Sequence, residues 1–287
     1  MYDRLDRLGD TVFQHGPFND RVYVMKTAAD DLPELLPYLE NLAGRRGYGK
    51  VIAKVPRDCR DAMLAWGARE EAVLPRYYRG REDACFMARY FEAARVNERR
   101  PDEVDAHLTL AEAKAEEAPS PADHVTWDAD VVVATPDDTA DMARVYAEVF
   151  PTYPFPIQDP AYLRQAMAAN VVFFALRHEG AIGALASAEM DQANLAVEMT
   201  DFATLPALRG RGAAQALLRT MEVAMRERGF VTGFTIARAY SAGMNITFAK
   251  CGYSFGGTLT NNTNIGGAIE SMNVWHRPLA GASAARS

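Results

Sequence analysis

The segment Thr204-Leu205-Pro206-Ala207-Leu208-Arg209-Gly210-Arg211-Gly212-Ala213-Ala214 lies between a predicted strand and a long predicted helix. Two glycines let the backbone turn tightly, so that several N–H groups point to one centre. The start of a helix adds about half a positive charge. The segment therefore predicts an anion cradle that suits a pyrophosphate, with Arg209 and Arg211 as charge-assisted donors. A simple helix-start turn is the alternative, but it requires neither the second glycine nor the arginines.

Two other phosphate-binding motifs do not fit. A dinucleotide fold requires Gly-x-Gly-x-x-Gly on a parallel sheet, whereas Gln215 occupies the third glycine position. A Walker loop requires Gly-Lys-Ser/Thr, and no lysine follows Gly212. The segment 44–51 matches Gly-x4-Gly-Lys but ends in valine and lies after a helix and before a strand, which is the reverse of what phosphate binding requires.

Hydrophobic periodicity extends the pattern on both sides of the cradle. Strands are predicted at 131–134, 171–176, 181–190, 195–203, 234–237, 257–259 and 271–275. Helices are predicted at 137–150, 159–169, 214–229 and 243–250. The fold class is α/β in the α+β sense, with a mixed, mostly antiparallel sheet and flanking helices.

A similar but less complete order of predicted helices and strands occurs in residues 1–95. Helices are predicted at 32–43 and 59–66, and strands at 51–53, 73–78 and 84–91. Residues 1–95 are therefore suspected to be a degenerate copy of the second half of the downstream domain; an unrelated small α/β domain is the alternative. A charged helix and the Pro119-Ser120-Pro121 breaker predict a connector, which divides the chain into domains 1–118 and 119–287. The tail from about residue 280 is expected to be disordered.

Composition narrows the class of protein. The chain has 287 residues, of which 49% are hydrophobic and 24% charged, and 31 basic against 38 acidic residues give a net charge of −7. This balance disfavours nucleic-acid binding. No apolar run reaches the roughly 20 residues that span a bilayer and no secretory signal is visible, so no membrane association and a cytoplasmic location are expected. Three scattered cysteines, and histidines that never recur at i, i+4, predict no metal site.

The motif Arg209-x-x-Gly212-x-Ala214 resembles the Arg/Gln-x-x-Gly-x-Gly/Ala signature of the GNAT acetyltransferase superfamily. The predicted order of strands and helices in residues 130–278 also resembles the order in that superfamily. More narrowly, the chain resembles the β-lysine N-acetyltransferase family over nearly its whole length. The segments that carry this resemblance are 198–206, 235–245, 256–264 and 270–275.

This resemblance implies acetyl-CoA as donor and the terminal (ε) amine of β-lysine as acceptor, with N-epsilon-acetyl-β-lysine serving as a compatible solute. It also implies lysine 2,3-aminomutase as a functional partner, and a homodimer is possible. The implied cofactor contacts are Ala203, Thr204, Arg209, Gly210, Arg211, Gly212, Ala213, Ala214, Ser241 and Asn245. Another polyamine, amino acid or protein amine, or a non-catalytic acyl-CoA-binding regulatory role, is the alternative function.

The chemistry requires a base, because removing a proton from an alkylammonium at pH 7 costs roughly 4.6 kcal/mol. Glu198, six residues before Thr204, occupies the strand position where GNAT enzymes often carry this glutamate. An exposed strand carboxylate is the alternative. Asp201 has the opposite strand parity, so one of the two carboxylates is expected to face away from the acceptor. Glu189, Asp191 and Asp201 are expected to attract a dicationic amino acid.

Leaving-group protonation has no obvious donor. Many members of the superfamily place a tyrosine where this chain has Phe248. Tyr240 is therefore the candidate for the general acid; the alternatives are Tyr253, Ser241, water, or a reaction without a general acid. A backbone N–H near Ala203 or Thr204 is expected to polarise the thioester carbonyl.

The acceptor carboxylate also needs a partner, for which Arg238 is one candidate. Asn261, Asn262, Asn264 and Asn273 offer neutral donors, although a hairpin turn alone favours asparagine. Tyr153 and Phe155 are expected to border the acceptor site, or to serve as core residues. Residues 1–95 are expected to bind no CoA, because no glycine stands where the cradle should be.

Overall fold

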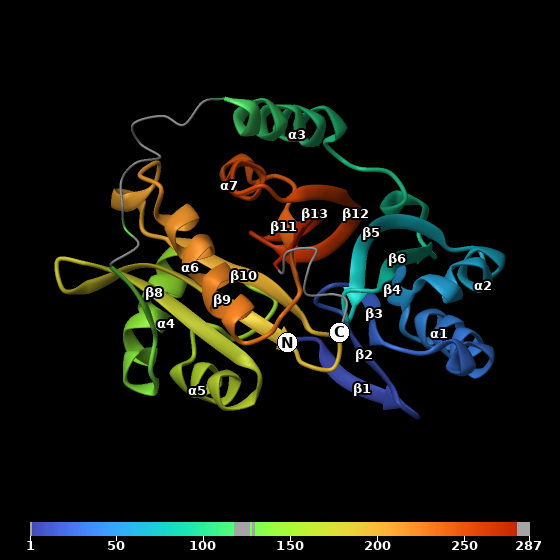
Figure 1. The fold of residues 1–287 in the computed structure, drawn as a ribbon. Coiled ribbons are helices and arrows are strands. Elements are labelled where there is room, and N and C mark those ends of the chain that lie inside the picture. The colour runs from blue at the N-terminus through green and yellow to red at the C-terminus, as the bar shows by residue number, and fades with distance from the viewer. Residues whose placement is uncertain (1, 118–126, 128–129, 280–287) are drawn as a thin grey trace.

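The computed structural model describes residues 2–117, 127 and 130–279, and shows one continuous sheet (Figure 1). Thirteen strands are found in this described part, in the order β1-β2-β3-β4-β6-β5-β12-β13-β11-β10-β9-β8-β7. The N-terminal half of the sheet comprises β1 (Arg4–Leu8), β2 (Thr11–Gly16), β3 (Arg21–Lys26), β4 (Lys50–Pro56), β5 (Arg69–Tyr78) and β6 (Glu82–Tyr90). The C-terminal half comprises β7 (Val131–Val133), β8 (Val171–His178), β9 (Ala181–Asp191), β10 (Ala196–Thr204), β11 (Thr232–Arg238), β12 (Ser254–Ile265) and β13 (Ala268–Pro278).

The two halves share one topology. The order β1-β2-β3-β4-β6-β5 repeats as β8-β9-β10-β11-β13-β12, and in each half the third and fourth strands pair in parallel. The halves meet where Gly257 of β12 pairs with Ala72 of β5. Gly257 has a φ of 134°, and a Cβ there would lie 2.2 Å from the Glu71 carbonyl oxygen, so only glycine permits this approach.

Helices cover one face of the N-terminal half and both faces of the C-terminal half. α1 (Leu32–Arg46) and α2 (Arg60–Ala65) bury Leu35, Leu39 and Met63 against the N-terminal half. α6 (Ala213–Glu227) and α7 (Ala242–Lys250) cover one face of the C-terminal half, while α4 (Thr139–Val149) and α5 (Pro160–Ala169) cover the other. α3 (Pro101–Glu116) lies across α7, and a ring nitrogen of His107 is 3.1 Å from the Ala239 carbonyl oxygen (Figure 1).

The inner faces of the two halves pack against one another. Ile52, Leu74 and Phe86 from the N-terminal half share a core with Phe234 and Val274 from the C-terminal half. Alternation along each strand sends one side chain to this core and the next to the outer helices. The sheet therefore curls, so that β4 and β5 come to face β9, β10 and β11.

The predicted fold class is confirmed: a mixed, mostly antiparallel sheet is flanked by helices, with a further sheet-rich region before it. The sequence analysis missed β1, β2 and β3, which are only five or six residues long. Because the sheet runs on through β5 and β12, the halves are not separate sheets, and the division near residue 118 stays a prediction. The Pro119-Ser120-Pro121 breaker and the tail from 280 lie outside the described residues. In the described part of the chain, none of the helices has the length and apolar character that a membrane span requires.

Candidate active site

The site forms where β10 and β11 separate. These parallel strands pair only from Ala196 with Thr232 to Glu198 with Phe234. Beyond Glu198 they diverge, and a cavity of about 850 Å³ occupies the gap. Both strands line it, with Thr200, Asp201, Phe202 and Thr204 on one side and Thr235, Ile236, Ala237 and Arg238 on the other. The cavity therefore connects the face covered by α6 and α7 with the inner face of the sheet.

One end of the cavity is the predicted cradle. Gly210 and Gly212 adopt left-handed φ values of 72° and 79°, and α6 begins directly after Gly212. Gly212 offers no side-chain cap, and the first N–H groups of a helix lack intrahelical acceptors. Arg209, Gly210, Gly212, Ala213 and Ala214 all line the cavity. This end suits a diphosphate, as the sequence predicts.

The two cradle arginines differ in placement. Arg209 lines the cavity, and its Nε donates to the Thr204 carbonyl at 3.1 Å. The guanidinium of Arg211 instead lies 5.1 Å from the ring centre of Trp127, whose indole N–H donates to the Arg211 carbonyl at 2.7 Å. Trp127 thus fixes the cradle backbone and draws Arg211 away from the cavity lining. Sequence spacing alone could not separate the two arginines.

The outer rim of the cavity includes the end of α3. Lys114 and Glu117 line it together with Lys250 at the end of α7. Lys114 Nζ donates to the Glu117 carboxylate at 2.7 Å. The sequence marked α3 only as a connector, because its charged surface is typical of a solvated helix. Its packing on α7 brings these side chains to the rim.

A β-bulge places Asp201 on the same face as Glu198. Thr200 pairs with Ser187 but Ala203 pairs with Leu185, so β10 carries one extra residue, and Asp201 has a φ of 56°. The Asp201 carboxylate accepts hydrogen bonds from Ser187 Oγ at 2.5 Å and from the Tyr153 hydroxyl. Ser187 and Glu189 are two residues apart on β9, so their side chains point to the same face of the sheet, and Glu189 pairs with Glu198. The carboxylates of Glu189, Glu198 and Asp201 therefore lie on one face. The prediction that strand parity separates Glu198 from Asp201 is therefore wrong.

The N-terminal half supplies a cation to this face. Lys54 of β4 donates from Nζ to the Tyr77 hydroxyl at 2.6 Å, and the Tyr77 hydroxyl donates to Asp191 at 2.8 Å. Lys54 Nζ also lies 5.6 Å from the ring centre of Phe234, the strand partner of Glu198. The sequence gave no signal for Lys54, because only the curl of the sheet brings β4 opposite β10.

The half-buried Glu198 carboxyl has an elevated pKa. Burial is the largest cause and the Glu189 charge adds to it, while Lys54 opposes both; together they raise the pKa of Glu198 to about 8. Burial likewise raises the pKa of Asp201, against the hydrogen bonds from Ser187 and Tyr153. A carboxylate with a raised pKa is a stronger base than an ordinary glutamate, which suits deprotonation of an amine.

Several predicted residues lie at the cavity, and several lie elsewhere. Tyr153, Thr204, Ser241 and Arg238 line it. Arg238 Nε and Nη2 donate to Glu270 at 2.8 and 2.6 Å, which leaves the Nη1 edge of its guanidinium unused by this pair. Ala203 is buried among α4-side residues, between the cavity-lining Phe202 and Thr204.

Asn245 and Tyr240 have packing roles in the structure. The Asn245 amide donates to the Arg238 and Ser241 carbonyls and accepts from Asn273 and Trp275, so its hydrogen-bonding capacity is used within the protein. The Tyr240 hydroxyl donates to Glu98 before α3, outside the cavity lining. Neither side chain is oriented for the expected cofactor or acid role.

Four predicted acceptor contacts, Glu189, Phe155, Asn262 and Asn264, lie outside the cavity lining, and so does the predicted base Glu198. Glu189 and Glu198 share their face of the sheet with Asp201, which does line the cavity. Phe155 is 39% exposed. Asn262 is buried beside Arg21, which donates to its carbonyl at 2.6 Å, and the Asn264 amide donates to the Phe18 carbonyl at 2.9 Å. The asparagines therefore connect β12 to the N-terminal half.

Phe248, where the resemblance led us to look for a tyrosine, lines the cavity, and its ring packs against Tyr253 with centroids 5.1 Å apart. No group of three or more metal-binding side chains occurs within residues 2–117, 127 and 130–279.

The splayed parallel strands, the glycine-rich cradle at a helix start and the carboxylate beside the gap define the class as GNAT N-acetyltransferases. The model of the acetyltransferase (GNAT) family matches residues 140–253. The protein is accordingly an acetyl-CoA-dependent N-acetyltransferase.

The particular family follows from three relatives. The chain is 36% identical to the beta-lysine N(6)-acetyltransferase of Methanococcus maripaludis, over 96% of this chain and 98% of the relative. It is 32% identical to the beta-lysine N(6)-acetyltransferase of Methanosarcina mazei, over 86% and 97%. It is 31% identical to the N-acetyltransferase YodP of Bacillus subtilis, over 93% and 96%. The chain belongs to the β-lysine N(6)-acetyltransferase family.

Proposed function

We propose that this protein transfers the acetyl group of acetyl-CoA to the terminal (ε) amine of β-lysine, giving N-epsilon-acetyl-β-lysine. The observation that carries the proposal is the single cavity that joins the cradle to the carboxylate face through the gap between β10 and β11. A donor bound at the cradle and an amine bound beside Glu198 would meet in this gap. The near full-length similarity to two beta-lysine N(6)-acetyltransferases supports the choice of acceptor.

The donor side uses the cradle. The free N–H groups at the start of α6 and the Arg209 guanidinium bind the diphosphate, and Gly210 and Gly212 keep side chains out of its way. Backbone N–H groups near Ala203 and Thr204, at the splayed edge, polarise the thioester carbonyl. Ser241 lines the same cavity, and its hydroxyl is the proposed proton donor to the departing thiolate.

The acceptor side holds a molecule with two amines and one carboxylate. Glu189, Glu198 and Asp201 provide negative charge for the amines, and Tyr153 orients Asp201 through its hydrogen bond. Arg238, oriented by Glu270, binds the carboxylate through its remaining N–H groups. Glu198 accepts the amine proton, after which the neutral nitrogen attacks the thioester directly.

We further propose a cytoplasmic enzyme whose product is a compatible solute, with lysine 2,3-aminomutase as the supplier of β-lysine and a homodimer as the assembly. Residues 1–95 bind no CoA in this proposal. The candidate contacts at Phe155, Tyr240, Asn245, Asn262 and Asn264 are not retained, because their side chains are placed elsewhere.

A panel of amines with a free-thiol assay tests the function. β-Lysine is expected to give the highest kcat/KM among β-lysine, α-lysine and linear polyamines, and mass spectrometry should place the acetyl group on the terminal nitrogen. A higher kcat/KM for α-lysine or for a polyamine would replace β-lysine as the acceptor and leave the acetyl transfer itself intact.

A further inference from the structure

A wide bulge interrupts β12 next to the cavity. Leu259 pairs with Met272 and Thr263 pairs with Glu270, so Thr260, Asn261 and Asn262 all stand opposite Ser271 alone. Asn261 has a left-handed φ of 46°. Backbone groups in such a bulge lose their ladder partners, and buried carbonyls need replacements.

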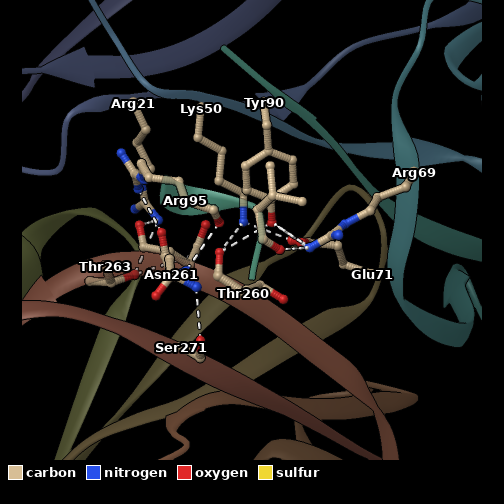
Figure 2. Close-up of polar contacts among 12 residues, drawn as sticks. Arg21, Lys50, Arg69, Glu71, Tyr90, Arg95, Thr260, Asn261, Thr263 and Ser271 are labelled. Carbon is tan, nitrogen blue, oxygen red and sulfur yellow. Dashed lines mark hydrogen bonds and ion pairs between the residues drawn. The ribbon is translucent and has the colours of Figure 1, made fainter. Parts of the chain in front are cut away.

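Three cations of the N-terminal half provide those replacements, one for each carbonyl (Figure 2). Lys50 Nζ donates to the Thr260 carbonyl at 2.8 Å, Arg95 Nη2 to Asn261 at 2.6 Å and Arg21 Nη1 to Asn262 at 2.6 Å. Lys50, Arg95 and Arg21 are 0%, 1% and 5% exposed, and they come from β4, from the short helical turn Ala93–Arg95 and from β3. We call these three residues the cation clamp.

The bulge returns hydrogen bonds to the N-terminal half. The Asn261 amide donates to the Arg95 carbonyl at 3.0 Å and to Asn97 at 2.7 Å. The backbone N–H of Asn264 donates to Asn19 Oδ1 at 2.7 Å. The contact is therefore reciprocal, and both its backbone and side-chain parts fix the position of β12.

The residues that flank the bulge reach the acceptor side of the cavity. Ile265, at the end of β12, and Met272, the partner of Leu259, line the cavity. Glu270, the partner of Thr263, holds Arg238. The hairpin after Ile265 also contacts the loop that carries Tyr153, because the Gly267 N–H donates to Thr152 Oγ1 at 2.9 Å.

Burying three cations is an expensive way to stabilise a fold, even where a carboxylate lies beside them. Glu71 binds Lys50 at 2.7 Å and also accepts from Arg69 (Figure 2). Asp20 binds Arg95 at 2.9 Å, whereas the guanidinium of Arg21 donates to the neutral oxygens of Asn262 and Thr263. Apolar side chains of similar size often stabilise a core as well or better. What the cations provide is a defined geometry for three consecutive carbonyls.

We infer that Arg21, Lys50 and Arg95 are positioning residues for the acceptor amine: by holding the β12 bulge they fix the cavity wall formed by Ile265, Met272 and the Arg238–Glu270 pair. This inference rests on the proposed acceptor side of the cavity. It gives the N-terminal half a role in amine binding and none in binding acetyl-CoA.

Arg21→Met is the sharpest test, because the hydrogen bonds of Arg21 go to Asn262 and Thr263 and no carboxylate loses its partner. The KM for the amine is expected to rise about tenfold, while the KM for acetyl-CoA stays within about twofold. Hydrogen exchange in the segment 263–270 should become faster. Arg21→Lys keeps the charge and one donor, so it should restore most of the amine KM.

The matched control is Leu39→Ala, which removes a fully buried side chain from the core between α1 and the N-terminal half of the sheet. It should lower Tm without changing either KM. If Arg21→Met lowers Tm as Leu39→Ala does and leaves the amine KM unchanged, or if both KM values rise together, the inference is wrong. Should Arg21→Met not fold, Arg21→Gln, which also removes the cation, takes its place, and a wild-type amine KM with wild-type exchange in that variant would equally contradict the inference.

The measurement uses whichever amine the wild-type enzyme acetylates best. Its outcome is therefore separate from the identity of that amine: a different preferred acceptor would correct the proposed function and leave the cation clamp to be judged by the two KM values.

Discussion

The two halves of the molecule share the order of six strands, with a helix after the third strand and another after the fourth, yet among the described residues the cavity at the cradle forms only in the C-terminal half. α6 starts after Arg209-Gly210-Arg211-Gly212, whereas α1 starts after Asp30 and Asp31, with Pro33 and Glu34 in its first turn. Acidic side chains at a helix start compete with any bound anion for the same N–H groups. The topology by itself therefore does not create the coenzyme site.

A second difference lies in the parallel strands. β3 and β4 stay paired over four residues, from Arg21 with Lys50 to Val24 with Ala53, while β10 and β11 separate after three. β3 carries no carboxylate, whereas β10 carries Glu198 and, through its bulge, Asp201. We infer that this fold acetylates an amine only where a cradle, a gap between the parallel strands and a base occur together, as they do in the C-terminal half.

The base should give the largest effect. Glu198→Gln is expected to lower kcat by about 100- to 1000-fold, because it removes the group that deprotonates the amine. The loss should be greatest between pH 8, above which wild-type Glu198 is ionised, and about pH 10.4, above which the free amine appears without help. Binding of CoA, measured by calorimetry, should not change.

Glu179→Gln in the exposed β8–β9 turn serves as the matched control and should behave as wild type. Equal activity of Glu198→Gln and wild type at every pH would remove Glu198 from the mechanism and make the two halves more alike than we propose.

The cradle should give the next largest effect. Gly212→Asp places a carboxylate where the diphosphate binds, as the N-terminal half does at α1, and should weaken acetyl-CoA binding about 30- to 100-fold. Gly180→Asp is a suitable control, because its φ of 82° imposes the same backbone conformation at a remote turn. Calorimetry should register one acetyl-CoA per wild-type chain. A second equivalent would show that the N-terminal half also binds the coenzyme, and full binding by Gly212→Asp would remove the α6 cradle from coenzyme binding.

Lys54 joins the halves electrostatically, and its effect should be smaller. Because Lys54 lowers the pKa of Glu198, Lys54→Met should raise that pKa further above its ordinary value. Less Glu198 is then ionised at neutral pH, so kcat/KM at pH 7.5 should fall about threefold while activity at pH 9.5 is retained. A pH–rate profile with its acidic limb unmoved would mean that the N-terminal half does not influence the base.

Tyr240→Phe should have the smallest effect on catalysis. Its hydroxyl donates to Glu98, outside the cavity lining, so kcat should stay within about twofold of wild type while stability falls by about 1 kcal/mol for the lost hydrogen bond. Chemical denaturation and steady-state rates measure the two quantities. A large fall in kcat would restore Tyr240 as the general acid and assign a catalytic role to the contact with α3.

Much of the C-terminal half could be predicted from the sequence, because its helices and strands have clear periods and its cradle is marked by glycines. Contacts that depend on chain segments far apart could not be predicted. Lys54 approaches Glu198 only across the curled sheet, and Trp127 separates the roles of Arg209 and Arg211. The asparagines of β12 look like turn or ligand residues in the sequence, but they form the contact with the N-terminal half.

The sequence by itself determined the fold class, and it located the glycine-rich turn of the proposed cradle and the strand of the proposed base, because local periodicity and glycine conformations are encoded by neighbouring residues. Only the tertiary structure decided which side chains share the acceptor face. One extra residue in β10 reverses the alternation that places Asp201, and the curl of the sheet brings a lysine from the other half beside Glu198. Both depend on how distant strands pair, which strand periodicity alone does not specify.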